Sequence, residues 1–328
     1  QYDRRHGWRG AEARINVNAN DKSNWINALR KLPVISEFPV ALALSVNNSS
    51  ARLMLRDGSE IRIGPGAANG TGKSLSGALA AGDVVRLRAV GDSFVLAQIP
   101  KAQAALVSLQ PEDGALRAVV GGFSYNTSGF NRATQAKRQP GSSFKPFIYT
   151  AAFERGYSPS SVVLDAPVVF KDRKGNVWRP QNDKGGFKGP MRLREALVQS
   201  RNLVSVRLLD GIGVNFARDY ITRFGFAKEA LPPNLSMSLG TASLTPISVA
   251  RGYSVFANGG FLIEPYFIKS VTGPSGVMIG YSHPKRACGL CPERLAGDTS
   301  KAVVVDGFDL SDTGLAQDEL AKAGAGFD

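Results

Sequence analysis

Histidine, cysteine and long apolar runs are all scarce in this chain of 328 residues. Only two histidines occur, His6 close to the start and His283 close to the cysteines, so neither is placed like the base of a Ser-His-Asp triad. No stretch approaches the roughly 18 consecutive apolar residues of a membrane span, and no basic-then-apolar leader opens the sequence. We therefore expect neither a membrane-spanning segment nor a secretion leader within these residues.

The two cysteines form a single pair, Cys288 and Cys291, with two residues between them. This spacing permits a disulfide, a redox pair or half of a metal site. Zinc is the weakest of these interpretations because no second pair exists, although His283 could supply a third ligand. We expect a loop with one disulfide, and no metal or cofactor.

Acidic residues are fewer than basic ones, 27 against 40, which gives a formal net charge of +13. Such a surface favours anionic partners, which include nucleic acid, phospholipid headgroups and substrates that carry pyrophosphate. The charge alone does not choose among them. At this length, with 43% hydrophobic residues, one large domain and one small domain are expected.

The first hundred residues change from a helical to a strand pattern. Residues 21–32 have apolar residues at helical spacing, with Asn20 or Asp21 as a cap and Pro33 as a stop. Strand and hairpin patterns follow, at 40–46, 51–63 and 84–97, and residues 64–82 are predicted to be a loop. We therefore predict a linker over residues 1–33 that packs on the helical domain of residues 102–328, and a five-stranded OB-like β barrel over residues 34–101.

Aromatic residues are too few in this β module for nucleic-acid binding of the usual kind. Single-strand binders stack bases on aromatic side chains, yet the module has only Phe38 and Phe94, at positions typical of a core. We expect no nucleic-acid partner. Residues 102–328 begin with another hairpin and turn helical from about residue 140, so the predicted fold class is α+β.

The segment around Ser142 has the pattern of a helix that begins at a nucleophile. Apolar residues follow at i, i+3, i+4 and i+7, namely Phe144, Phe147, Ile148 and Ala151. Pro146 falls in the first turn, where proline is tolerated, and Gly156 lies where a C-terminal cap belongs. Ser142 and Lys145 therefore lie on one face of the helix start.

This pair has a chemical use. A serine hydroxyl is a weak nucleophile until a base takes its proton, and lysine can be that base only when its pKa is lowered. A helix N-terminus supplies positive potential and free N–H groups that can hold an oxyanion. Since histidine is so scarce, Ser142 is the candidate nucleophile and Lys145 the candidate base.

A second motif, Ser200-Arg201-Asn202, follows an amphipathic helical stretch. Its hydroxyl and carboxamide could bind a substrate amide and relay a proton to a leaving group. Taken alone, both patterns are common and are typical of turns. They recur in this chain at Ser282 to Lys285, Ser45 to Asn47 and Ser124 to Asn126.

Longer runs around these motifs occur in an order that is far more specific than any one of them. The runs lie at residues 2–10, 129–133, 139–146, 194–202 and 256–260. Together they closely resemble the transpeptidase portion of class A, bifunctional penicillin-binding proteins, from residue 1 to about residue 280. The resemblance implies a penicillin-binding/serine β-lactamase-like fold with an OB-like module, following an absent glycosyltransferase domain.

The resemblance also implies roles for four residues. Ser142 would be acylated by the penultimate D-alanine of a peptidoglycan stem peptide, and Lys145 would be its base. Ser200 would pass protons, and Asn202 would bind the donor amide. An acceptor amine would then complete the crosslink, and a β-lactam would stop the reaction at the acyl-enzyme.

Further expectations concern the intact protein. The resemblance implies lipid-linked precursor as substrate, a regulatory protein that docks on the OB-like module, and a single-pass anchor beyond this sequence. It places the protein at the periplasmic face of the bacterial inner membrane. A disulfide between Cys288 and Cys291 suits that compartment.

One departure from the family is the third motif, Lys-Thr-Gly or Lys-Ser-Gly, which we do not find. The nearest string, Lys269-Ser270-Val271-Thr272-Gly273, has the wrong spacing and comes too early. A cut or rearranged sequence, two pieces joined across a gap, or a domain without catalysis would explain this, and an effect of a cut or gap is favoured. The alternatives to a transpeptidase are therefore an inactive scaffold of the same fold, and a serine β-lactamase or β-lactam sensor.

Overall fold

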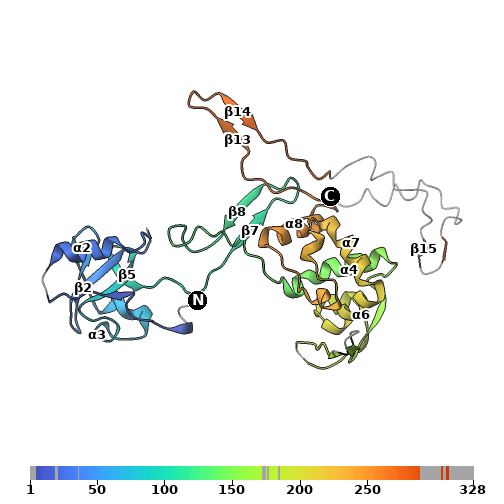
Figure 1. The fold of residues 1–328 in the computed structure, drawn as a ribbon, viewed down its shortest axis with the longest axis horizontal. Coiled ribbons are helices and arrows are strands. Elements are labelled where there is room, and N and C mark those ends of the chain that lie inside the picture. The colour runs from blue at the N-terminus through green and yellow to red at the C-terminus, as the bar shows by residue number, and fades with distance from the viewer. Residues whose placement is uncertain are drawn as a thin grey trace, which may run out of the picture.

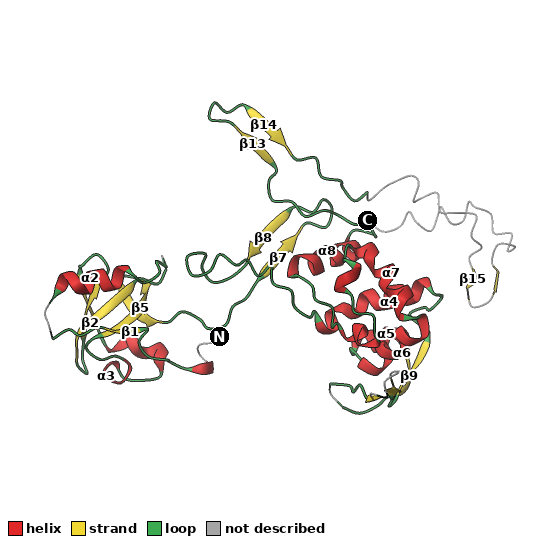
Figure 2. Ribbon diagram, viewed as in Figure 1, coloured by secondary structure: helices red, strands yellow, loops and turns green. Residues whose placement is uncertain are grey.

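The computed structural model describes residues 5–18, 21–35, 37–171, 175, 177–183, 185–288, 304–305 and 308–309. The chain forms two separate lobes with a β hairpin between them (Figure 1). The first lobe consists largely of strands and the second largely of helices, as the colouring in Figure 2 shows. This is the α+β arrangement that the sequence predicts.

The first lobe is a six-stranded antiparallel sheet with the order β1-β5-β2-β3-β4, and β6 pairs with β5. Its strands are β1 (Ala13–Arg14), β2 (Val40–Val46), β3 (Ala51–Leu55), β4 (Glu60–Ile63), β5 (Asp83–Val90) and β6 (Ser93–Ala97). Residues 64–82 are not the plain loop that we predicted. They contain the 3₁₀ helix η1 (Pro65–Thr71) and the short helix α3 (Leu75–Ala78), because buried Ala68 and Leu75 complete the core on this side.

Helix α2 (Lys22–Arg30) begins as predicted, with the Asp21 carboxylate capping the backbone N–H of Asn24. Its buried side chains, Trp25 and Leu29, pack against strands β2, β3 and β5 of the same lobe. Strand β1 pairs with β5, and Trp8 Nε1 donates a hydrogen bond to the carbonyl of Ala78. The prediction that residues 1–33 pack on the helical domain of residues 102–328 is therefore wrong for residues 8–30, which complete the β module instead.

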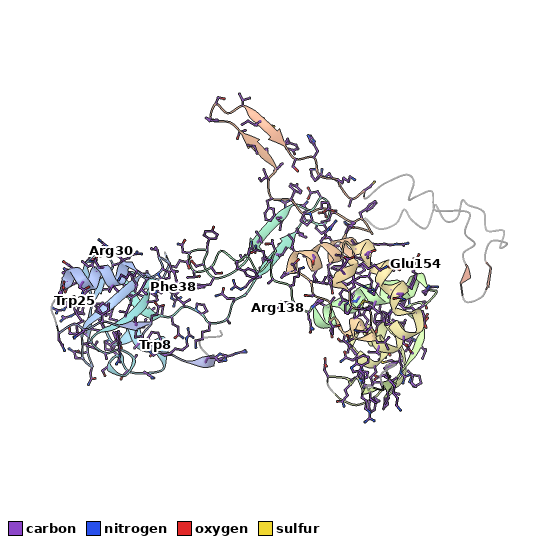
Figure 3. All side chains as sticks on the ribbon, viewed as in Figure 1. Trp8, Trp25, Arg30, Phe38, Arg138 and Glu154 are labelled. Carbon is purple, nitrogen blue, oxygen red and sulfur yellow. The ribbon has the colours of Figure 1, made fainter. Side chains whose placement is uncertain are left out.

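The lobes meet at a small contact beside the connecting hairpin. Phe38, which Figure 3 labels at the edge of the first lobe, packs against Phe123 with ring centroids 5.3 Å apart. Asn126 Nδ2 donates a hydrogen bond of 2.9 Å to the carbonyl of Val34. The connecting hairpin consists of β7 (Leu106–Leu109) and β8 (Leu116–Val120).

The second lobe surrounds helix α4 (Lys145–Glu154), which the turn η2 (Gly141–Phe144) precedes. The other helices are α5 (Leu193–Val198), α6 (Asn202–Ile212), α7 (Val214–Ile221) and α8 (Pro246–Ala257), with 3₁₀ turns η3 (Thr222–Phe224), η4 (Lys228–Ala230) and η5 (Leu235–Leu239). The remaining strands form short antiparallel pairs: β9 (Val162–Asp165) with β12 (Gly189–Arg192), β10 (Phe170–Lys171) with β11 (Val177–Trp178), β13 (Ser270–Thr272) with β14 (Met278–Tyr281), and β15 (Val304–Val305) with β16 (Phe308–Asp309).

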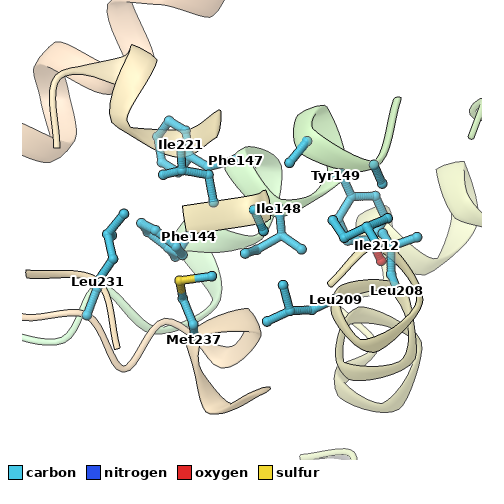
Figure 4. Close-up of a cluster of buried hydrophobic side chains, with 14 of the residues drawn as sticks. Phe144, Phe147, Ile148, Tyr149, Leu208, Leu209, Ile212, Ile221, Leu231 and Met237 are labelled. Carbon is cyan, nitrogen blue, oxygen red and sulfur yellow. The ribbon is translucent and has the colours of Figure 1, made fainter. Parts of the chain in front are cut away.

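The core of this lobe confirms the apolar stripe predicted after Ser142. Phe144, Phe147 and Ile148 are all fully buried, among side chains from α6, α7 and η5 (Figure 4). Phe147 makes edge-to-face contacts with Phe224 and Phe226, with ring centroids 5.0 Å apart in both pairs. Because this packing fixes α4 on three sides, the turn that carries Ser142 is attached to a rigid helix.

Candidate active site

Ser142 lies exposed in the η2 turn, directly before the buried Phe144. The turn is pinned from the other side by Gly240, whose carbonyl accepts a 3.1 Å hydrogen bond from the N–H of Gly141. Both glycines have positive φ, 59° and 76°. A side chain on Gly240 would place its Cβ 1.9 Å from the carbonyl oxygen of Gly141, so only glycine allows this approach.

Two further contacts hold the chain on each side of Ser142. Arg138 and Leu244 exchange backbone hydrogen bonds of 2.8 and 3.1 Å. The hydroxyl of Tyr253 on α8 donates a 2.7 Å hydrogen bond to the carbonyl of Ser143. The residues around Ser142 are thus fixed by a segment that lies about 100 positions later in the sequence.

Lys145 is almost completely buried, with 1% of its surface exposed. Its ammonium group donates three hydrogen bonds, to the Ser200 carbonyl at 2.6 Å, the Ser200 Oγ at 3.0 Å and the Asn202 Oδ1 at 2.7 Å. An ammonium has three donors, so all of them are satisfied. The structure thus joins three of the four predicted site residues directly, and Ser142 lies one helical turn before Lys145.

The environment of Lys145 favours loss of its proton. Burial lowers the pKa of Lys145 from its ordinary value to about 8, a decrease that nearby Asp183 opposes and Arg201 assists. All three hydrogen-bond acceptors are neutral, which leaves the positive charge poorly compensated. At pH 7 roughly one lysine in ten is then the neutral amine that a general base must be.

Ser200 has a backbone conformation that explains how one residue supplies two of these acceptors. Its φ of 54° lies in the left-handed region, and it is the one residue other than glycine with positive φ in the described part of the chain. This turn between α5 and α6 brings both its carbonyl and its hydroxyl to Lys145. Such strain is a feature of functional sites, and the surrounding contacts must maintain it.

A buried ion pair maintains the loop at Ser200. The guanidinium of Arg201 donates from Nε to Asp165 Oδ2 at 2.9 Å and from Nη2 to the same carboxylate, which is fully buried. Burial raises the pKa of Asp165, but hydrogen bonds from Asn182, Arg201 and the backbone of Lys188 outweigh it and hold the pKa below its ordinary value. Sequence reasoning missed Asp165 and Asn182, because their partners lie far away in the sequence.

The motifs that repeat the predicted spacings do not form comparable sites. Ser282 and Lys285 follow strand β14 in a segment that is neither helix nor strand, so the two side chains do not share the face of a helix. The nearest string to a third motif, Lys269 to Gly273, lies on the β13–β14 hairpin. That hairpin projects away from α4 and α6 (Figure 1).

Comparison with known families gives independent matches to both lobes. The family model "Penicillin binding protein transpeptidase domain" matches residues 104–290, more than half of the chain. The chain belongs to this family. The model "Penicillin-binding protein OB-like domain" matches residues 8–102, which also includes the region predicted to be a linker. The predicted family and fold class are therefore confirmed.

Individual relatives agree with this assignment. Penicillin-binding protein 1A of Pseudomonas aeruginosa is 44% identical over 299 residues, which cover 87% of this chain and 36% of that protein. The crystal structure of penicillin-binding protein 1A from Haemophilus influenzae superposes with a TM-score of 0.79 at 40% identity, covering 88% of this chain and 43% of that one. The chain thus spans well under half the length of these relatives.

A more distant structure is that of an acyl-enzyme complex. Penicillin-binding protein A from M. tuberculosis, described as an imipenem acyl-enzyme complex, matches with a TM-score of 0.51 at 25% identity. It covers 56% of this chain and 52% of that chain.

Three sequence expectations concern other groups. Cys288 is disulfide-bonded, whereas Cys291 lies outside the described residues. None of the helices in the described ranges combines the length and the hydropathy needed to cross a bilayer. Within those same ranges, no cluster of three or more His, Cys, Asp or Glu side chains could hold a metal ion.

Proposed function

We propose that this chain carries the serine acyl-transfer site of a peptidoglycan DD-transpeptidase, with Ser142 as nucleophile and Lys145 as base. The observation that supports this most is the state of Lys145. It is buried one turn after an exposed serine, it has neutral acceptors only, and its pKa is lowered to about 8.

The proposed acylation step uses these groups in sequence. Neutral Lys145 takes the Oγ proton of Ser142 as Oγ bonds to the carbonyl carbon of the penultimate D-alanine. Backbone N–H groups at the helix start favour the resulting oxyanion. The C–N bond to the terminal D-alanine then breaks, and the proton on Lys145 passes through the Ser200 hydroxyl to the leaving nitrogen.

Deacylation would reverse these roles. An acceptor amine from a neighbouring stem peptide bonds to the acyl carbon and gives its proton to Lys145. The ester bond to Ser142 breaks, and the serine oxygen recovers a proton. A β-lactam would acylate Ser142 in the same way and remain attached, as the description of the imipenem complex says of the M. tuberculosis protein.

The role of Asn202 needs a refinement within this proposal. Its Oδ1 faces Lys145, and its Nδ2 is already engaged by the Gln181 carbonyl at 2.9 Å and by Asp183 Oδ1 at 3.1 Å. Binding of a donor amide by Asn202 would therefore require an exchange of partners. In the described state its supported role is to hold Lys145.

The wider expectations for the intact protein belong to the same proposal. They are lipid-linked precursor as substrate, a single-pass membrane anchor outside this sequence, a site at the periplasmic face of the inner membrane, and a regulatory protein bound to the OB-like module. They rest on the resemblance to the family, and the chain covers only part of the relatives named penicillin-binding protein 1A.

One labelling experiment tests the central claim. The full-length gene product is incubated with a fluorescent penicillin, next to its Ser142→Ala variant. We expect a covalent adduct in the wild type that the variant lacks. Absence of any adduct in the wild type would refute acyl transfer, as an inactive scaffold predicts. An adduct that turns over within seconds would indicate a β-lactamase instead.

A further inference from the structure

The segment Gln181–Asp183 contacts the site from a direction that neither sequence motif includes. Asn202 Nδ2 donates two hydrogen bonds, one to the Gln181 carbonyl at 2.9 Å and one to Asp183 Oδ1 at 3.1 Å. Lys145 can only donate, so the atom of the Asn202 amide that faces it must be the oxygen. The segment therefore fixes which end of this amide the lysine meets.

The residue between them attaches the segment to helix α6. Asn182 Oδ1 accepts hydrogen bonds from the backbone N–H groups of Asn202 at 2.9 Å and Leu203 at 3.3 Å, which have no partner within the helix. Asn182 Nδ2 donates to the buried Asp165 Oδ1 at 2.9 Å. Because Asn182 is itself buried, Asp183 is held in place by a rigid neighbour.

Asp183 is exposed, and it is connected to Lys145 through the amide of Asn202. A carboxylate that accepts from one end of an amide makes the oxygen at the other end a stronger acceptor. It therefore strengthens the hold on a charged ammonium. The charges that act on Lys145 are those of Asp183 and Arg201: burial lowers the pKa of Lys145 first, Asp183 raises it, and Arg201 lowers it.

We propose that Asp183 is a positioning residue, which acts through Asn202 and favours the ammonium form of Lys145. This inference rests on the proposed acyl-transfer function. With Asp183 charged, the site holds the ammonium firmly and in one orientation. Without that charge, the lysine gives up its proton at a lower pH.

The Asp183→Asn variant separates charge from geometry. A carboxamide at this position still offers an oxygen to Asn202 Nδ2 but carries no charge. Acylation of the full-length protein by a fluorescent penicillin is measured as a second-order rate between about pH 5.5 and pH 9. We expect the acidic limb of the profile to move to lower pH, with a rate about threefold higher at pH 6. The plateau at high pH should not change.

Two further variants make the result specific. Asp183→Ala removes the charge and also leaves one amide hydrogen of Asn202 without its acceptor, so we expect the same move of the acidic limb together with a lower plateau. Asp210→Asn removes the same charge from an exposed position further along α6, and its profile should coincide with that of the wild type.

The outcomes distinguish this inference from the function on which it rests. If the wild type forms no adduct at Ser142, the proposed function fails. If the wild type is labelled and the Asp183→Asn profile coincides with it, the positioning role of Asp183 is refuted while the function stands. A profile that moves to higher pH refutes the role as well.

Discussion

Each lobe contains a positive charge that is almost completely buried, and these two charges are held in opposite ways. Arg86 in the β module is 1% exposed, as is Lys145 in the helical lobe. Arg86 Nε pairs with the carboxylate of Glu12 at 3.0 Å, and its Nη1 donates to the carbonyls of Pro33 and Phe38. Lys145 meets neutral acceptors only.

This difference distinguishes a cation that stabilises the fold from a cation that can lose its proton. A guanidinium keeps its proton under all ordinary conditions, so Arg86 can only bind β1, β5 and the chain after α2 together. A buried ammonium with no adjacent carboxylate partner is poised to lose its proton. Burial by itself thus does not mark a catalytic group, whereas the charge of its partners does.

The largest expected effect comes from making Lys145 resemble Arg86. The variant Lys145→Arg keeps the charge but cannot supply a neutral base, so we expect acylation by penicillin to fall about 10³-fold. The second-order labelling rate measures this, with circular dichroism as the control for folding. Near-normal labelling of a folded Lys145→Arg protein would exclude general-base catalysis by this residue.

The converse change removes the structural cation. Arg86→Met leaves Glu12 and two backbone carbonyls without their donor, and should lower the free energy of unfolding of the β module by about 2 kcal/mol. Urea titration measures this decrease. The labelling rate of Ser142 should stay within about twofold of the wild type, and a large loss of labelling would show that the lobes are not independent.

The smallest effect is the pH dependence of the wild type. As pH falls below about 8, the ammonium form of Lys145 increases and the base is lost. We expect the acylation rate to drop about tenfold from pH 7 to pH 6 and to level off above pH 8. Stopped-flow fluorescence at fixed ionic strength follows this change, and a flat profile between pH 6 and pH 8 would contradict it.

Local patterns predicted the features that depend on neighbours in sequence. Helix α2 with its Asp21 cap, the hairpins of the β module and the buried stripe from Phe144 onward all follow from spacing and turn residues. The Ser-x-x-Lys pattern at Ser142 is informative because it lies at the start of a helix. The same pattern at Ser282 to Lys285 does not lie at a helix start.

Long-range contacts account for what local patterns missed. Asp165 ends an apolar strand, and Asn182 and Asp183 lie in a polar stretch. Their partners at Arg201 and Asn202 are 19 to 36 positions away. The assignment of residues 1–33 failed for the same reason, since pairing of β1 with β5 spans about 70 residues. The spacing of apolar and polar residues along the chain does not reveal which distant segments pair with each other.

The close approach of Gly240 to Gly141 also determines when the turn at Ser142 can form during protein synthesis. The turn that carries Ser142 needs the carbonyl of Gly240 and the bridge to Leu244, so it cannot adopt this form until the ribosome has added about 100 more residues. At about 5–20 residues per second, the delay is roughly 5–20 seconds. During that interval the nascent chain already contains Ser142 and Lys145, but the contacts that hold the turn at Ser142 cannot yet form.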